Sequence, residues 1–186
     1  MYPCGHIIKR SAHRYEASVD MQIALSRKGD YAVRAVLDLA RHAGTGRRKS
    51  REIAEVMDIP ERYLPQILAL LVRQGFLVAT AGPDGGYELA RPPAKITLLE
   101  VVEAAEGPVA NTECLLRGGP CDWENACPLH APWSRAQSAL TAQLRQTTFA
   151  ELAASDEALE AGLEPVAAPP PTAPRTPRRG VRPPHA

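Results

Sequence analysis

The feature that most constrains the fold is a change of hydrophobic period near residue 75. Before it, apolar residues recur at helical spacing in three segments, at about 26–42, in a short stretch from Ser50, and at 61–74. After it, FLVAT and YELA flank the Gly-rich stretch AGPDGG, a pattern typical of a β-hairpin. Helix, short helix, tight turn, helix and hairpin follow in the order of a winged helix-turn-helix.

Capping and breaking residues set the expected limits of these helices. Ser26 and Ser50 are placed to cap the first and second helices, and Gly75 to end the third. Pro65 lacks an amide donor and lies near the first turn of the third helix. We therefore expect this helix to bend or to begin late.

The second half of the chain is predicted to be helical as well. One helix spans about Leu98–Glu106, and a last short helix begins at TTFAEL. Between them, a long helix carries an apolar stripe of Leu129, Trp133, Ala136, Leu140 and Leu144. Because such a stripe is unfavourable when exposed on a monomer, it predicts a dimer. The expected fold is mainly α with a small β-hairpin wing: a winged helix-turn-helix domain plus a long dimerisation helix.

Composition divides the chain into four expected parts. Residues 1–20 form a disordered lead-in before a natural-looking start at Met21, and residues 21–97 form the DNA-binding domain. Residues 98–155 hold a cysteine-rich loop and the dimerisation helix. Residues 156–186 form a disordered Pro/Arg-rich tail.

The charges are distributed asymmetrically. Residues 21–99 carry twelve Lys or Arg against eight acids, whereas residues 100–164 carry three against eleven. This predicts that the first half meets a polyanion. No apolar run is long enough for a membrane span or a secretory signal, so we expect a cytoplasmic protein.

Two groups of side chains are candidates for contacts with DNA. Residues at the start of the third helix can reach base edges in the major groove, and those leading into the second helix can bind phosphates. The hairpin tip can lie against the minor groove or the backbone. We expect Tyr63 to be partly packed, and helix-turn-helix geometry also serves protein contacts. The candidates are Glu61, Arg62, Tyr63 and Gln66; Arg47, Arg48, Lys49, Ser50 and Arg51; and Gly82, Gly85 and Gly86.

The cysteine-rich loop has the spacing Cys114-x6-Cys121-x5-Cys127-x2-His130. In a reducing compartment, clustered thiols are typical of metal sites. Zinc sites usually bring ligands in pairs two to four residues apart, and only Cys127 and His130 are that close. The longer gaps favour an iron–sulfur cluster, while zinc and unliganded thiols remain as alternatives.

Several stretches together resemble one protein family. LSRKGDYAVRAVLDLA, IAEVMDIPERYLPQILALL and GPDGGYELARP, followed by the cysteine loop, are similar to the IscR/NsrR family of bacterial winged-helix regulators. The resemblance implies a homodimeric transcription factor, often a repressor, which would bind a palindromic site. It also implies an iron–sulfur cluster held by the three loop cysteines. Family members often carry an Arg before the wing glycines, whereas this chain has Thr80–Ala81–Gly82. The resemblance therefore does not extend to minor-groove reading by the wing.

The fourth ligand has two candidates. His130 follows Cys127 as in the IscR-like branch, where three Cys and one His hold a 2Fe–2S cluster. Asp30 lies where the nitric-oxide-sensing branch uses an Asp from across the dimer to hold a 4Fe–4S cluster. We favour His130 and a 2Fe–2S cluster that senses redox state, nitric oxide or iron–sulfur status. A zinc-stabilised interaction module and a cluster-free regulator are the alternatives, and no nucleotide loop or nucleophile–base pair indicates an enzyme.

Overall fold

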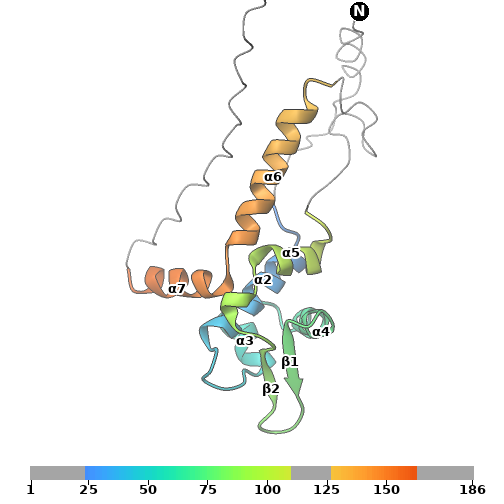
Figure 1. Ribbon diagram of the computed structural model, residues 1–186. Coiled ribbons are helices and arrows are strands. Elements are labelled where there is room, and N and C mark those ends of the chain that lie inside the picture. The colour runs from blue at the N-terminus through green and yellow to red at the C-terminus, as the bar shows by residue number, and fades with distance from the viewer. Residues whose placement is uncertain (1–23, 110–126, 163–186) are drawn as a thin grey trace, which may run out of the picture.

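The computed structural model describes residues 24–109 and 127–162 and shows the expected winged helix (Figure 1). Three helices are followed by a two-stranded antiparallel sheet, and three further helices cover and extend this body. The elements are α2 (Arg27–Arg41), α3 (Ser50–Val56), α4 (Leu64–Arg73), β1 (Leu77–Thr80), β2 (Gly86–Leu89), the 3-10 turn η1 (Pro93–Lys95), α5 (Leu98–Glu106), α6 (His130–Gln146) and α7 (Phe149–Glu160).

Helix α2 forms the centre of the hydrophobic core. The Ser26 side chain caps it, as expected, by accepting hydrogen bonds from the amides of Lys28 and Gly29. Its buried face packs against residues of α3, α4, β1, α5 and α7 in a single cluster. The DNA-binding segment and the segment expected to follow it from residue 98 therefore share one core.

The starts of the two helices of the helix-turn-helix follow from their capping residues and from Pro65. Ser50 is the first residue of α3, and Lys49 occupies the cap position, so the predicted cap is wrong by one residue. The Glu52 carboxylate accepts the Lys49 amide at 3.0 Å and satisfies that end of the helix. Helix α4 begins at Leu64 with Pro65 in its first turn, which confirms the expected late start. Residues 61–63 consequently lie in the turn that precedes α4.

A third segment of extended chain pairs with the two-stranded wing. Strand β1 pairs with β2 from Leu77↔Leu89 to Thr80↔Gly86. On the other side of β2, Arg48 forms a β-bridge with Tyr87, with amide–carbonyl distances of 2.9 and 2.8 Å in the two directions. The segment before α3 is thereby joined to the wing, and we call this junction of residues 47–49 with 86–88 the wing root.

Helices α5 and α7 are tied to each other at their starts. Thr97 and Thr148 cap them with matching capping boxes and also form a β-bridge. The Phe149 amide donates to the Ile96 carbonyl at 2.9 Å, and the Phe149 side chain is fully buried. This junction fixes α7, and the last turn of α6 before it, against the body.

Helix α7 includes the first five residues of the expected tail, 156–160. Arg41 of α2 is the physical reason, because its Nη1 contacts Asp156 Oδ2 at 2.9 Å and Glu160 Oε1 at 2.8 Å. The hydrogen bond from Arg41 lowers the pKa of the Glu160 carboxyl below its ordinary value. Residues 1–23 and 163–186, which cover the lead-in and the rest of the tail, lie outside the described residues.

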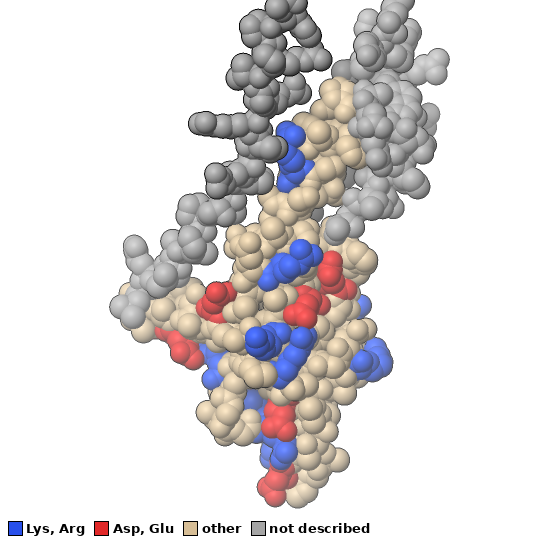
Figure 2. All heavy atoms as spheres, viewed as in Figure 1, with Lys and Arg blue, Asp and Glu red and all other residues tan. Residues whose placement is uncertain are grey.

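Helix α6 projects away from the body (Figure 1). It has 17 residues, none of them buried, and so is about 25 Å long. Figure 2 shows it as a largely tan rod above a body on which basic and acidic side chains alternate. No helix among the described residues is long and apolar enough to cross a membrane.

Candidate nucleic-acid interface and cysteine segment

The turn before α4 presents most of the expected base-reading side chains to solvent. Glu61, Arg62 and Gln66 are exposed, whereas Tyr63 is half-buried. The Tyr63 ring packs on that of Tyr31 in α2, with centroids 6.1 Å apart. The Arg62 guanidinium lies over the Tyr63 ring, with Cζ 4.7 Å from its centroid. As expected, Tyr63 is a packed residue, and here it supports Arg62.

Helix α2 also holds the opposite end of this turn. Arg34 donates from Nη1 to the carbonyl of Met57, the C-cap residue of α3, at 3.2 Å. Its Nε donates to Asp30 Oδ1 at 2.8 Å. Asp30, the alternative fourth ligand, is thus bound to an arginine that fixes the helix-turn-helix turn.

The basic segment before α3 divides into two kinds of residue. Arg47, Lys49 and Arg51 are exposed, and so is Ser50 at the start of α3. The side chain of Arg48 is only 17% exposed and points into the body, where it binds Asp38. Four members of this segment are therefore available to a phosphate backbone, and the fifth is held inside.

Two of the exposed arginines make loose contacts with acids. Arg47 Nε lies 3.3 Å from Glu88 of β2, with both side chains about 41% exposed. Arg51 Nε lies 3.9 Å from Glu61 Oε1, and both side chains are largely exposed. Exposed pairs of this kind contribute little, about 0–1 kcal/mol, so either arginine can exchange its partner for a phosphate. The second contact also places the start of α3 beside the turn of residues 61–63.

The wing glycines serve mainly to build the hairpin. Gly82 is exposed, with a φ of +108° that favours glycine. Gly85 is buried, and a Cβ at this position would collide with the backbone of Thr80. A Cβ on Gly86 would lie 2.6 Å from the Arg48 carbonyl oxygen. Of the three wing candidates, the tip residue Gly82 is the one that the fold leaves open to a DNA backbone.

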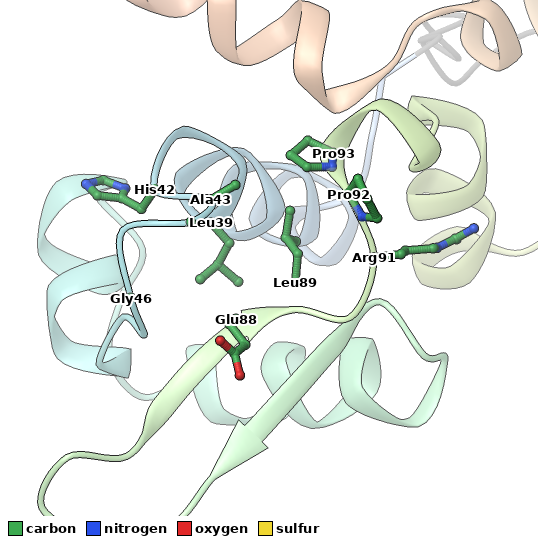
Figure 3. Close-up of a pocket in the computed structure, with 10 residues that line it drawn as sticks. Leu39, His42, Ala43, Gly46, Glu88, Leu89, Arg91, Pro92 and Pro93 are labelled. Carbon is green, nitrogen blue, oxygen red and sulfur yellow. The ribbon is translucent and has the colours of Figure 1, made fainter.

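A shallow hollow lies between the end of α2, the loop that follows it, and the end of β2 with the prolines after it (Figure 3). Leu39 and Leu89 point into it, while Arg91 points away. The polar side chains at its rim are bound to neighbours: Glu88 to Arg47, Arg91 to Glu100 at 2.9 Å, and His42 Nδ1 to the Asp38 carbonyl at 2.8 Å. We assign no ligand to this hollow.

Of the expected metal ligands, Cys127 and His130 lie in the described part of the chain, and Cys114 and Cys121 lie outside it. Cys127 is a half-buried free thiol, and its carbonyl accepts the His130 amide at 3.2 Å. His130 is the first residue of α6, and its Nε2 lies 3.4 Å from Ser134 Oγ. A thiol and an imidazole thus stand together at a helix start, and both suit an iron–sulfur cluster or zinc. Within residues 24–109 and 127–162, no three His, Cys, Asp or Glu side chains gather as a metal site.

The two candidate fourth ligands lie on different parts of one protomer. His130 begins α6 at the end that projects from the body, whereas Asp30 lies in the first turn of α2 (Figure 1). The structure of the single chain does not bring them together.

Sequence reasoning missed the buried contact between Asp38 and Arg48. Asp38 stands among Ala35, Val36 and Leu39 on the buried face of α2. A lone acid in an apolar stripe needs a buried partner. This was the signal that could have shown that one of the nearby arginines points inward.

Comparison with known proteins shows which family this fold and sequence belong to. A family model described as "Rrf2: Iron-dependent Transcriptional regulator" matches residues 25–155, which is most of the chain. The chain belongs to the Rrf2 family. Rrf2 proteins are transcriptional regulators. This confirms the resemblance found in the sequence and the expectation of a regulator rather than an enzyme.

Individual Rrf2 relatives agree in sequence and in fold. The chain is 35% identical over 136 residues to the HTH-type transcriptional regulator IscR of Enterobacter sp. (strain 638), covering 73% of this chain and 83% of that protein. It resembles the structure of CymR, the global cysteine regulator of B. subtilis, with a TM-score of 0.63 and 28% identity over 72% of this chain and 98% of that one. The structure of T. potens IscR matches with a TM-score of 0.59 and 28% identity, over 77% and 93% of the two chains. The winged-helix fold expected from the sequence is thereby confirmed.

Proposed function

We propose that this Rrf2 protein is a cytoplasmic, homodimeric repressor whose affinity for a palindromic operator is set by an iron–sulfur cluster. Cys114, Cys121, Cys127 and His130 would hold the cluster, which we expect to be of the 2Fe–2S type. Asp30 is the alternative fourth ligand, with a 4Fe–4S cluster. The signal would be redox state, nitric oxide or iron–sulfur supply.

The exposed polar side chains of the helix-turn-helix support the DNA-binding part. Arg62, just before α4, and Gln66, in its first turn, are exposed at the position from which a recognition helix reads base edges. Arg can bond bidentately to guanine and Gln to adenine. Arg47 and Lys49 flank the same unit and would supply phosphate contacts.

The apolar side chains of α6 support the dimer. Leu129 is 46% exposed and Leu140 37% exposed, although both belong to the stripe expected from the sequence. Packing α6 against the same helix of a second copy would cover this stripe, since a two-fold interface joins identical surfaces. Such a dimer would present two recognition helices to the two halves of a palindrome.

The ends of α6 support a link between the cluster and DNA binding. The observation that carries the proposal is that Cys127 and His130 lie at one end of a helix whose other end is fixed to the winged-helix body. At that other end, the Leu98 amide donates to the Thr147 carbonyl at 2.9 Å. A change of order at the His130 end would therefore reach the body through α6. Cys114 and Cys121 come after α5 in the sequence, so α5 would be a second route.

The ligand set explains why the cluster would respond to its surroundings. When bound, the cluster supplies a centre that oxidants, nitric oxide or iron shortage can alter. The imidazole of His130 is the one non-thiolate ligand, and the Ser134 hydroxyl beside its Nε2 would orient the ring. Loss of the cluster would free the three thiols and the imidazole together. Typical couplings between two sites are about 1–3 kcal/mol, or roughly 5–150-fold in affinity.

Metal analysis tests the cluster directly. Full-length protein purified without oxygen is expected to contain iron and acid-labile sulfide in equal amounts and to be brown or red, whereas Cys114→Ala should contain neither. Colourless wild-type protein with one zinc per chain would replace the cluster with a zinc-stabilised site. Protein free of metal would leave a cluster-free regulator.

DNA selection tests the interface. Full-length protein should enrich palindromic duplexes from a random pool, and its affinity for them should fall steeply as salt rises. Arg62→Ala should weaken binding and relax the base preference at one position of each half-site, by about 1–3 kcal/mol. Arg73→Ala, an exposed arginine at the far end of α4, is the matched control. Failure of the protein to enrich any sequence would contradict the proposal.

A further inference from the structure

Asp38 is the one fully buried acidic side chain in the described part of the chain. Its Oδ2 accepts Arg48 Nε at 3.0 Å, and its Oδ1 accepts Arg48 Nη2 at 3.1 Å. The hydrogen bonds that Arg48 donates to Asp38 raise the pKa of the Arg48 guanidinium, which stays charged. His42 is the second basic neighbour, with Nδ1 3.7 Å from Asp38 Oδ1. This is the bidentate contact that a guanidinium forms with a carboxylate and that a lysine cannot reproduce.

Arg48 joins three parts of the DNA-binding unit. Its side chain reaches Asp38 in α2, and its Nη1 lies 3.4 Å from Glu52 in the first turn of α3. Its backbone exchanges two hydrogen bonds with Tyr87 in β2. The end of α2, the start of α3 and the wing therefore meet at one residue.

The direction of Arg48 decides the direction of its neighbours. The segment runs extended beside β2, and side chains in extended chain point alternately to opposite sides. With Arg48 directed inward to Asp38, Arg47 and Lys49 are directed outward and are exposed. Gly86 allows this close approach, since a Cβ there would meet the Arg48 carbonyl.

We propose that the Asp38–Arg48 pair is a positioning device for the DNA interface and that Arg48 does not itself contact phosphate. The pair fixes the wing relative to the helix-turn-helix and turns Arg47 and Lys49 toward the DNA. This inference rests on the proposed DNA-binding function and corrects the sequence-based expectation that all five residues at 47–51 bind DNA.

Substitution of Asp38 distinguishes a positioning role of Arg48 from a phosphate-binding role by the direction in which DNA affinity changes. If Arg48 positions the interface, Asp38→Asn should weaken binding of full-length protein to the selected duplex by about tenfold, within the usual range for coupled sites. If Arg48 contacts phosphate, the same change frees its guanidinium, so affinity should stay the same or rise. Binding would be followed by fluorescence anisotropy over a series of KCl concentrations, with a random-sequence duplex of equal length beside it.

The salt dependence gives a second, independent readout. Arg47→Met, the matched control, should make the slope of log affinity against log salt shallower by about one, as expected for a lost phosphate contact. Arg48→Met and Arg48→Lys should lower affinity with the slope unchanged. A shallower slope for Arg48→Met, together with wild-type affinity for Arg48→Lys, would overturn the inference.

Amide exchange separates failure of this inference from failure of the proposed function. If the wild type selects no duplex, the proposed function fails, but the wing root can still be examined. Exchange of the Tyr87 amide, which donates to Arg48, should be faster in Asp38→Asn and Arg48→Lys than in Arg47→Met. Equal protection in all three would overturn the positioning role. If Asp38→Asn does not fold, Arg48→Lys provides both the affinity and the amide-exchange measurement. It keeps the positive charge and loses only the bidentate contact with Asp38.

Discussion

Asp30 accepts a hydrogen bond from Arg34, one turn further along α2, at 2.8 Å between Oδ1 and Nε. Since Arg34 also binds the carbonyl of Met57, which follows α3, the carboxylate has a structural role at the helix-turn-helix turn. Service as a cluster ligand would compete with this task. The contact therefore favours His130 as the fourth ligand of the proposed cluster.

Substitution of the two candidate ligands should have different effects on the cluster. We expect His130→Ala to lower the iron and sulfide content of anaerobic protein and to change its visible circular dichroism, because the imidazole is lost. Asp30→Ala should keep both signals, as should Glu55→Ala, an exposed acid on α3 that serves as the control. Loss of the cluster in Asp30→Ala with retention in His130→Ala would reverse the assignment.

A charge in the apolar stripe of α6 should separate the dimer. We expect Leu140→Asp to sediment as a monomer at concentrations where the wild type is a dimer, because a buried unpaired carboxylate is strongly unfavourable. Ser138→Asp places the same charge on the other side of α6 and should leave the dimer intact. Analytical ultracentrifugation distinguishes the two species. A dimeric Leu140→Asp would mean that the interface lies elsewhere.

Gly86 should be among the least replaceable glycines of the wing. Its φ is +153°, and an added Cβ would lie 2.6 Å from the Arg48 carbonyl oxygen. We expect Gly86→Ala to lower the free energy of unfolding by about 1–3 kcal/mol more than Gly44→Ala. Gly44 also has a positive φ, of +83°, but nothing lies within 4 Å of its added Cβ, so it reports the backbone strain alone. Equal losses in urea unfolding would show that the wing root is not close-packed.

Glu100 should stabilise the fold above its titration range and not below it. Burial by itself raises the pKa of this carboxyl, but hydrogen bonds from the Thr97 amide and hydroxyl and from Arg91 outweigh it and hold the pKa below the ordinary value of 4.5. A carboxyl with a lowered pKa in the folded state contributes stability above its ordinary pKa and loses it as pH falls through the folded pKa.

The corresponding measurement is urea unfolding of wild type and Glu100→Gln between pH 7 and pH 3. We expect the variant to be less stable at pH 7, by about 1 kcal/mol or less because the side chain is partly exposed, with the difference closing toward pH 3. In an Arg91→Met background the difference should be smaller. A gap between wild type and variant that widens as pH falls would contradict the assigned direction.

Local sequence signals predicted most elements because their causes are local. The Ser26 cap, the late start of α4 at Pro65 and the bounds of α5 all follow from neighbouring residues, and the structure confirms them. The Ser50 cap was wrong because Glu52 satisfies the Lys49 amide instead. Helix α7 continues past residue 156, where the tail was expected to begin, because Arg41, more than 100 residues away in the chain, binds Asp156 and Glu160.

The site was predictable in its exposed parts and not in its internal ones. The exposure of Arg62 and Gln66 follows from their place at the start of a recognition helix. The inward direction of Arg48 depends on Asp38, which is ten residues away and reached only through the fold. A partner for α6 requires a second chain, so the stripe alone predicts that a partner exists without fixing the geometry of the interface.

The central claim is that cluster state sets DNA affinity. The most direct measurement is the affinity of full-length protein for one duplex selected from a random pool, comparing cluster-loaded wild type with Cys114→Ala, both prepared without oxygen and at the same salt concentration. We predict a difference of at least about fivefold, the lower end of typical coupling between sites. Equal affinities, with iron and sulfide present in the wild type and absent from the variant, would contradict the account.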